Sequence, residues 1–393
     1  MTTPVRCARV ARVALVLAML ALGRVSAAQV PPVAVPAPSP APSPAPPKPA
    51  EAWFKLGATI FTDFTYQAAP RVTDSDKALV RKSEFEVRRA YINLTGGAAE
   101  VFSFRITPDV AARQSTAVSG TGLPADLKVG SSFDGSLTVR IKYAFAQASF
   151  DKMGPAGKGA WIRFGQQQTP YVDFMEGIYR YRFQGTVSAE RQGLLSSSDV
   201  GVSGHYELPH GYGDVHAGVY NGETYTKPEV NGRKAFQIRG SLRPLPGRAG
   251  LKGLRVHAFY DRDAPVAKAA RNRLATDVTF EHPRLNFGAH YLRAQDRPSA
   301  LSPVAARAKG WSVWVTPRPI AGLEGLFRYD HYQPNTAVAG FKREVIVGAA
   351  YWFRGLKAPQ AVAVLADYDR VDYDLVLGKP NERRWELKAL LGF

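Results

Sequence analysis

The sequence has very little cysteine: of its 393 residues, only Cys7 is one. This excludes a disulfide framework, a cysteine-ligated metal site and a cysteine nucleophile. Long apolar runs are also missing outside the extreme N-terminus, which excludes a bundle of membrane-spanning helices, because each such helix needs about 20 apolar residues. Methionine (4) is scarce beside Tyr (17) and Phe (20), a bias that favours strands over helices.

Acidic residues are outnumbered, with 33 Asp and Glu against 51 Lys and Arg and a net charge of +18. Such a surplus suits nucleic acid, anionic lipid or small anions, and composition alone does not choose among them. No histidine pair has a metal-ligating spacing, so no metal or other cofactor is expected. The segment Gly201–His205 resembles a nucleophile elbow around Ser203, but its second glycine comes one position early and no helix follows. We therefore do not expect an enzyme.

The first 52 residues are expected to lie outside the folded domain. Residues 1–28 combine a basic start, an apolar stretch from Val13 to Leu22 and the small residues Ser26-Ala27-Ala28, which is typical of a secretory signal peptide. Its removal takes away four Arg and leaves 47 basic and 33 acidic residues, a net charge of +14. Residues 29–52 contain ten of the 29 prolines, which predicts an extended, disordered periplasmic spacer.

From residue 53 onward the dominant period of apolar residues is two, which indicates strands. In the first segment Phe54, Leu56 and Ile60 share one face while Lys55, Thr59 and Asp63 share the other. The same pattern predicts sixteen strands, near residues 53–67, 84–95, 101–109, 136–150, 160–168, 199–208, 214–220, 234–242, 254–261, 274–281, 285–293, 310–317, 323–332, 343–353, 360–368 and 383–393.

The connections between these strands alternate between short and long. Seven short ones are marked by Gly or Pro, and eight long ones include 68–83, 110–135, 169–198, 262–273 and 294–309. Bacterial outer-membrane barrels have an even number of strands, short periplasmic turns and long outer loops. We therefore predict an all-β fold, a sixteen-stranded antiparallel transmembrane β-barrel over residues 53–393, in the outer membrane of a Gram-negative bacterium.

The last strand has an aromatic end. Trp385, Leu387, Ala389, Leu391 and Phe393 alternate with mostly polar or small residues. Such a strand, ending in Phe393, resembles the signal that the barrel-assembly machinery reads. A soluble barrel or sandwich is the alternative, but a sandwich needs a second apolar face, and here the other faces carry charge.

Four motifs resemble the phosphate-selective porin O/P family of bacterial outer membranes. They are Phe85–Leu94 with its Arg-Arg-Ala core, Gly165–Tyr171, Ser198–Val202 and Val219–Gly222. The resemblance extends over residues 53–225 and implies a homotrimeric channel with an inward-folded third loop and Arg or Lys residues that guide anions. Tyr171 stands where the family usually has Phe.

Charges on the non-apolar faces are expected to line the bore, because an outward Arg or Lys costs about 2–4 kcal/mol at mid-membrane. Positively and negatively charged side chains occur equally often on these faces, so the net charge of the chain does not establish anion selectivity. Arg105, Arg140, Lys142 and Arg163 fall on neighbouring strands beside Arg88 and Arg89, which predicts a basic wall. Acidic residues gather on the strands at 254–261, 274–281 and 323–332, so we expect a transverse field that selects ions.

Further positive charge falls in the connections. Arg262, Lys268, Arg271 and Arg273, together with Arg297, Arg307 and Lys309, predict a positive outer mouth. Arg180, Arg182 and Arg191 lie in the loop 169–198, where the family has its constriction, and we expect them to meet the basic wall. Alternatively, Tyr179 and Tyr181 of this loop belong to an interfacial aromatic girdle, as do Tyr291, Trp311, Tyr351 and Trp385.

The predicted function is passive diffusion of small solutes through an outer-membrane porin that prefers anions, with phosphate one candidate. One alternative is a non-conducting structural or adhesive barrel whose loops plug the lumen, and another is a barrel hydrolase that acts on lipid through Ser203. The expected partners are small anions and outer-membrane lipid. Nucleic acid is not expected, because an exported barrel does not meet it.

Overall fold

A computed structural model describes residues 52–99, 101–112, 137–297, 305–353, 355 and 361–393. The predicted signal peptide and the predicted spacer up to residue 51 lie outside these residues. None of the helices in the described part of the chain is long and apolar enough to cross a membrane.

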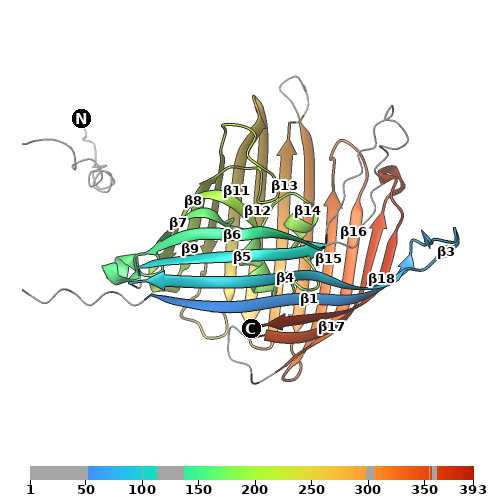
Figure 1. Ribbon diagram of the computed structural model, residues 1–393, viewed down its shortest axis with the longest axis horizontal. Helices are drawn as coiled ribbons and strands as arrows, with labels where there is room; N and C mark the ends of the chain where they lie inside the picture. The colour runs from blue at the N-terminus through green and yellow to red at the C-terminus, as the bar shows by residue number, and fades with distance from the viewer. Residues whose placement is uncertain (1–51, 100, 113–136, 298–304, 354, 356–360) are drawn as a thin grey trace, which may run out of the picture. The chain divides into compact units, whose positions relative to one another are not determined.

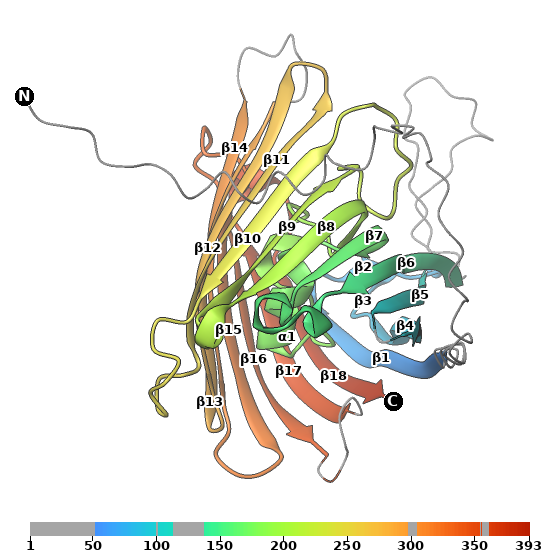
Figure 2. The same cartoon turned by 90° about the vertical axis from the view of Figure 1, so that its left-hand side faces the viewer.

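The described residues form a closed barrel of sixteen antiparallel strands in which each strand pairs with its neighbours in sequence (Figures 1 and 2). The prediction of sixteen strands is confirmed. The strands are β1 (Trp53–Ala69), β4 (Ser83–Ala98), β5 (Phe102–Ala112), β6 (Leu137–Ser149), β7 (Trp161–Gln168), β8 (Ser198–Leu208), β9 (Gly213–Tyr220), β10 (Ala235–Leu242), β11 (Leu254–Val266), β12 (Ala269–His282), β13 (Leu285–Asp296), β14 (Ala306–Pro317), β15 (Leu323–Gln333), β16 (Lys342–Trp352), β17 (Ala361–Tyr373) and β18 (Glu382–Gly392).

Smaller elements occupy the connections. A hairpin of β2 (Val72–Thr73) and β3 (Leu79–Val80) extends beyond the barrel rim between β1 and β4 (Figure 1). The loop after β7 carries the helices α1 (Val172–Tyr179) and α2 (Ser188–Arg191). Short 3-10 turns occur at Asp151–Met153, Pro155–Gly157, Pro209–Gly211 and Leu375–Leu377.

The first and last strands close the barrel, with a register that runs from Thr59 opposite Gly392 to Ala69 opposite Arg383. On the inner side of this seam, the carboxylate of Asp63 lies 3.6 Å from Lys388 Nζ and 2.5 Å from Arg88 Nε. Asp63 therefore joins three strands, β1, β4 and β18, by ion pairs.

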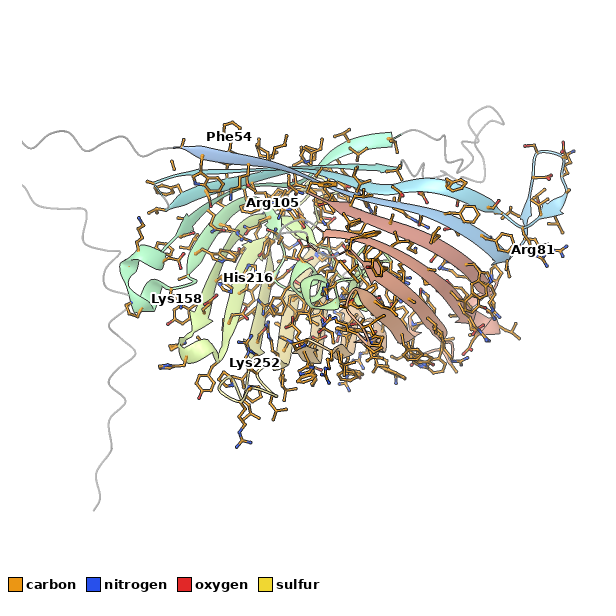
Figure 3. The ribbon with its side chains drawn as sticks, turned by 90° about the horizontal axis from the view of Figure 1, so that it is seen from below. Phe54, Arg81, Arg105, Lys158, His216 and Lys252 are labelled. Atoms are coloured by element: carbon orange, nitrogen blue, oxygen red, sulfur yellow. The ribbon has the colours of Figure 1, made fainter. Side chains whose placement is uncertain are left out.

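The outer wall of the barrel is apolar, as the period of two predicts. Phe54 is 77% exposed and Phe85 is 86% exposed, whereas Asp63 on the inner face of β1 is 5% exposed. In Figure 3, Phe54 points away from the ring and Arg105 points into it. Other exposed apolar residues of the wall are Leu56, Ile92, Val139, Phe164, Val202, Phe327 and Val347.

Two β-bulges change which side chains face the bore. Arg88 is the extra residue on β4, because Arg89 pairs with Phe61 and Val87 pairs with Thr62. Lys142 is the extra residue on β6, opposite the break at Thr107 and Pro108. A bulge lets consecutive side chains face the same side, and proline is tolerated in a sheet at such a break.

The bulge at Lys142 corrects one sequence expectation. Strict alternation places Tyr143 and Phe145 outside with Leu137, Val139 and Ile141. Instead, Tyr143 and Phe145 are both buried, while Leu137, Val139 and Ile141 are exposed. The extra residue inverts the alternation along the rest of β6.

The predicted long loop at 262–273 is wrong. Strands β11 and β12 continue through it and leave only residues 267 and 268 in the turn, where Lys268 has a φ of 58°. The misjudgement arises because polar residues occupy both faces of these strand ends, so no apolar alternation marks them. Arg262 and Arg271 are consequently strand residues on opposite faces of the wall.

Candidate functional site: the bore and its constriction

The loop between β7 and β8 folds into the lumen, as the family resemblance implies. Figure 3, which looks along the bore, shows its helix in the middle of the ring of strands. Gly165, near the start of the motif that leads into the loop, has a φ of 119°, a conformation that favours glycine because other residues would clash.

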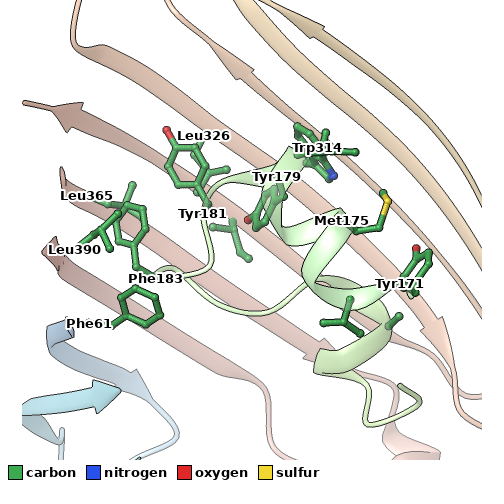
Figure 4. Packing of buried hydrophobic residues seen from close by; sticks show 14 of the residues in the cluster. Phe61, Tyr171, Met175, Tyr179, Tyr181, Phe183, Trp314, Leu326, Leu365 and Leu390 are labelled. Atoms are coloured by element: carbon green, nitrogen blue, oxygen red, sulfur yellow. The ribbon is translucent and has the colours of Figure 1, made fainter. Parts of the chain in front are cut away.

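Apolar packing holds this loop against one side of the barrel (Figure 4). Tyr179, Tyr181 and Phe183 are almost completely buried. Tyr179 meets Trp314 of β14 with ring centroids 5.2 Å apart, and Tyr181 meets Trp352 of β16 at 5.9 Å. The girdle alternative for Tyr179 and Tyr181 is therefore wrong, because both rings lie inside the barrel.

Polar contacts fix the loop to the acidic strands. Arg180 Nη1 donates to Glu324 Oε1 at 2.9 Å, and Arg191 pairs with Glu344. Tyr171 OH donates to Asp277 Oδ1 at 2.7 Å. The loop thus covers the acidic side of the bore and neutralises part of its charge.

These contacts correct the expectation that the three loop arginines meet the basic wall: their ion-pair partners lie elsewhere, although Arg182 and Arg191 share one cavity with three arginines of that wall. Arg180 and Arg191 bind carboxylates on β15 and β16, on the other side of the lumen. Arg182 pairs with Glu176 of α1 at 3.0 Å. The acidic strands attract the loop arginines because these strands supply buried carboxylates that need a counter-charge.

An open cavity of about 830 Å³ remains between the loop and the strands β4, β6 and β16–β18. Five of the nine predicted site residues line it: Arg88, Arg89, Arg140, Arg182 and Arg191. Lys342, Arg384 and Lys388 line it as well. The bulge at Arg88 explains why Arg88 and Arg89, although consecutive, both act on the bore side.

Each of these eight cations has a carboxylate within 4.0 Å. Arg88 pairs with Asp63, and both Arg89 and Arg140 pair with Asp109 at 3.0 Å. Arg384 pairs with Asp369 at 2.8 Å and Lys388 with Glu386 at 3.0 Å. Lys342 shares Glu344 with Arg191. The cavity is therefore a charged but largely compensated network.

The pair of Glu176 and Arg182 differs from the others. Burial raises the pKa of the Glu176 carboxyl to about 8, an effect that the nearby Arg182 guanidinium opposes. Glu190 and Asp173 add to the rise and Lys142 opposes it. Below that pH the pair keeps a net positive charge at the edge of the cavity.

Four predicted residues do not line this cavity. Arg180 is paired with Glu324, and Arg105, Lys142 and Arg163 form what we call the basic strip, on β5–β7. In the described part of the chain, no carboxylate lies within 4.0 Å of their cationic nitrogens. Arg105 donates to Thr107 and Asn93 at 3.0 and 2.8 Å, and Arg163 donates to Gln147 and Gln168 at 2.7 and 3.1 Å.

Aromatic rings separate the cations of the basic strip. The Arg105 guanidinium lies 4.7 Å from the Tyr143 ring centroid, and the Arg163 guanidinium lies 4.7 Å from that of Phe145. Lys142 Nζ lies 4.9 Å from the Tyr91 centroid and is itself buried. Cation–π contact stabilises these charges without neutralising them, so Arg105 and Arg163 remain available to a passing anion.

Several acidic residues of the bore were not predicted from the sequence. Asp367 and Asp369 of β17 are buried on the inner face, and Asp263 of β11 pairs with Arg271. Asp367 and Asp369 have the same parity as the buried Ala363 and Leu365. This pattern already indicated Asp367 within the predicted strand 360–368, whereas Asp369 lies beyond its predicted end. Arg273 also pairs with Asp296, so the predicted positive mouth is partly compensated.

Ser203, the serine of the hydrolase alternative, is 2% exposed and faces the bore. Its hydroxyl donates to Gln167 Oε1 at 2.6 Å and lies 3.1 Å from His216 Nε2. Membrane lipid, which contacts the outer wall, does not reach this hydroxyl. The side chain acts here as part of a polar layer inside the barrel.

Fold and bore together define the class: the protein is a porin of the Gram-negative outer membrane. Residues 54–174 match the sequence model of the family of phosphate-selective porins O and P, which is the family that the motifs Phe85–Leu94 and Gly165–Tyr171 indicated. This match, in the first third of the barrel, contains β4–β7 and thus the whole basic strip. Comparison with the sequences of curated proteins finds no match.

Solved structures of outer-membrane porins share the fold. A loop L8 deletion mutant of OmpT from Vibrio cholerae has a TM-score of 0.57 at 14% identity, with 87% of this chain and 99% of that chain covered. An anion-selective porin from Comamonas acidovorans has a TM-score of 0.55 at 10% identity, with coverages of 87% and 100%. The channel DcaP of Acinetobacter baumannii has 0.53 at 13%, with 87% and 97%.

Asp109 provides a test of charge compensation in the cavity. In the variant Asp109→Asn, Arg89 and Arg140 lose the carboxylate that they share, so we expect the chloride-to-potassium permeability ratio to rise by about two- to fivefold. The zero-current potential in a KCl gradient measures this ratio. Asp76→Asn in the β2–β3 hairpin is the control, because it removes one acid outside the bore. An unchanged or lower permeability ratio in Asp109→Asn would contradict the idea that Asp109 compensates the charges of Arg89 and Arg140.

Proposed function

We propose that this porin is a passive channel that prefers small anions, with phosphate among them. The basic strip carries the proposal, because Arg105, Lys142 and Arg163 contact only neutral partners and aromatic rings in the described structure. An anion that approaches the strip gains an interaction that a cation lacks. The preference for anions is also supported by the phosphate-selective porin family, whose model matches residues 54–174, and by the anion-selective porin from Comamonas acidovorans, which has a similar fold.

Phosphate suits the strip chemically. Guanidinium groups bind phosphate oxygens through charge-assisted hydrogen bonds in a planar, two-pronged geometry. Arg105 and Arg163 donate hydrogen bonds to amide or hydroxyl oxygens. These neutral acceptors compete with an anion for the guanidinium less strongly than a carboxylate would. An arriving anion can therefore replace a neutral acceptor at small cost.

A planar-bilayer recording of the wild-type protein tests the proposal. We expect ohmic channels whose zero-current potential in a KCl gradient shifts toward the chloride value, and a reduced chloride current when phosphate is added. A preference for potassium would contradict anion selectivity. A silent protein would instead favour the non-conducting structural or adhesive barrel.

We further propose, as parts of the same function, export by residues 1–28, a spacer at 29–52, assembly through Phe393 and a homotrimer. The backbone of Phe393 bonds in both directions to Ala58 of β1, so the terminal residue is part of the closing seam. One structure of similar fold is described as the trimer form of OmpT from Vibrio cholerae, which supports the trimer.

A further inference from the structure

Four basic side chains lie on the outside of the barrel near the loop end of β11–β14. We call Arg262, Arg293, Arg307 and Lys309 the outer basic patch. All four are exposed, while the residues beside them in sequence, such as Asp261, Leu292 and Ala308, are buried on the inner face. Arg262, Arg307 and Lys309 were predicted for the pore mouth, but their strands turn them toward the membrane side.

The register brings the patch together across the strands. Arg293 stands directly opposite Lys309. One row nearer the loops, Arg262 and Arg307 lie at the two ends of the run Arg262–Asn272–Gln295–Arg307. Directly paired side chains on one face of a sheet lie about 5 Å apart, so Arg293 and Lys309 can contact one anionic group together.

Aromatic and apolar residues border the patch. Tyr291 and Trp311 form a pair one row nearer the membrane than Arg293 and Lys309, and Tyr260 and Leu274 continue the row of Arg293 and Lys309 on β11 and β12. Tyr and Trp rings at such positions mark the level of the lipid headgroups. A surface hollow of about 450 Å³ joins the two sets of residues, with Tyr260, Leu274, Tyr291, Arg293, Arg307 and Lys309 among its lining.

Comparison with β16–β18 shows that the patch is unusual. There, outward basic residues also stand near the loop end, but each has an aspartate: Arg343 pairs with Asp374 at 3.0 Å, and Arg370 and Arg383 pair with Asp372 at 2.7 and 2.6 Å. No carboxylate lies within 4.0 Å of the four patch cations among the described residues; Arg293 donates to the Tyr291 hydroxyl.

We propose that the outer basic patch binds the phosphate groups of a phosphorylated lipid in the outer leaflet. The loop end of such a barrel faces outward, and the apolar wall below the patch contacts acyl chains. A ligand in the hollow therefore has its chains on the wall and its anionic headgroup at the arginines. This inference is independent of the proposed anion preference, because the patch faces away from the bore.

The test compares two sets of neutralised residues in the purified, detergent-solubilised porin. The patch variant is R262Q/R293Q/R307Q/K309Q, and the matched control is R343Q/R370Q/R383Q, whose arginines already have aspartate partners. Binding of diphosphoryl lipid A and of its dephosphorylated form is measured by native mass spectrometry. We expect the patch variant to bind diphosphoryl lipid A at least about tenfold more weakly and the control less than about threefold.

Three outcomes would overturn the inference: unchanged affinity in the patch variant, an equal loss in the control, or equal binding of both lipids by the wild type. Displacement of the lipid by inorganic phosphate at about 1 mM or less would show a site for the free ion instead. Conductance and selectivity of the patch variant in bilayers show that it folds, and they should equal those of the wild type.

Discussion

Replacing Arg105 and Arg163 together by glutamate should turn the proposed anion preference of the channel into a cation preference. Both side chains are half-buried on the bore side, and neither has a carboxylate partner in the described structure, so their charges act on the permeating ion directly. Each reversal changes the energy of a nearby ion by on the order of 1 kcal/mol at the effective dielectric constant of a protein surface. The chloride-to-potassium permeability ratio should therefore fall by at least about tenfold.

The zero-current potential in a KCl gradient measures this change, and its sign should invert. The matched control is R343E/R370E, which also reverses two arginines with aspartate partners, but on the outer face of the barrel. We expect no inversion of sign in that variant, because neither side chain faces the bore. An unchanged sign in R105E/R163E would remove the basic strip from the selectivity site.

Truncating Tyr181 to alanine should release the inward loop from the wall. Tyr181 is fully buried, stacks on Phe183 at 5.6 Å and donates to Glu324 at 3.0 Å. Loss of a buried aromatic ring of this size costs about 3–5 kcal/mol. Because the sixteen strands do not depend on this ring, the expected result is an intact barrel with a larger and noisier single-channel conductance.

Tyr181→Phe is the control for this prediction. It keeps the ring and loses one hydrogen bond to Oε2 of Glu324, worth about 1 kcal/mol, while Arg180 and Arg318 still pair with Oε1 of that carboxylate. Its conductance should match that of the wild type. The heat-dependent mobility of the protein in gels reports whether the barrel is folded, and an unchanged conductance in Tyr181→Ala would show that the loop is held elsewhere.

The period of two was sufficient to predict all sixteen strands, because lipid demands an apolar side chain at every second position of a membrane strand. The period of two did not predict the strand ends that lie beyond the membrane, where lipid no longer requires apolar side chains. Beyond the membrane, the ends of β11 and β12 carry charge on both faces, and Arg262 and Arg271 were therefore assigned to a loop. The bulges at Arg88 and Lys142 were not predictable either, since they depend on the partner strand.

The candidate site was predictable in its residues but not in its pairings. All nine predicted cations lie inside the barrel, yet six of them are paired with carboxylates and three are not. Which cation meets which acid depends on how the loop packs, and that packing is set by Tyr179, Tyr181 and Phe183, which follow a period of two although they form no strand. A rule for strands says nothing about such a loop.

The seam between β1 and β18 has a consequence for folding. Asp63 is synthesised near the start of the barrel, and one of its partners, Lys388, comes almost at its end. Arg88 is close to Asp63 in sequence on the neighbouring strand, whereas the ion pair with Lys388 can form only when β1 and β18 pair and close the barrel. Closure of the barrel is thus coupled to completion of the ion pairs of Asp63 on its inner face. A chain that lacks β18 would leave this carboxylate with Arg88 but without Lys388.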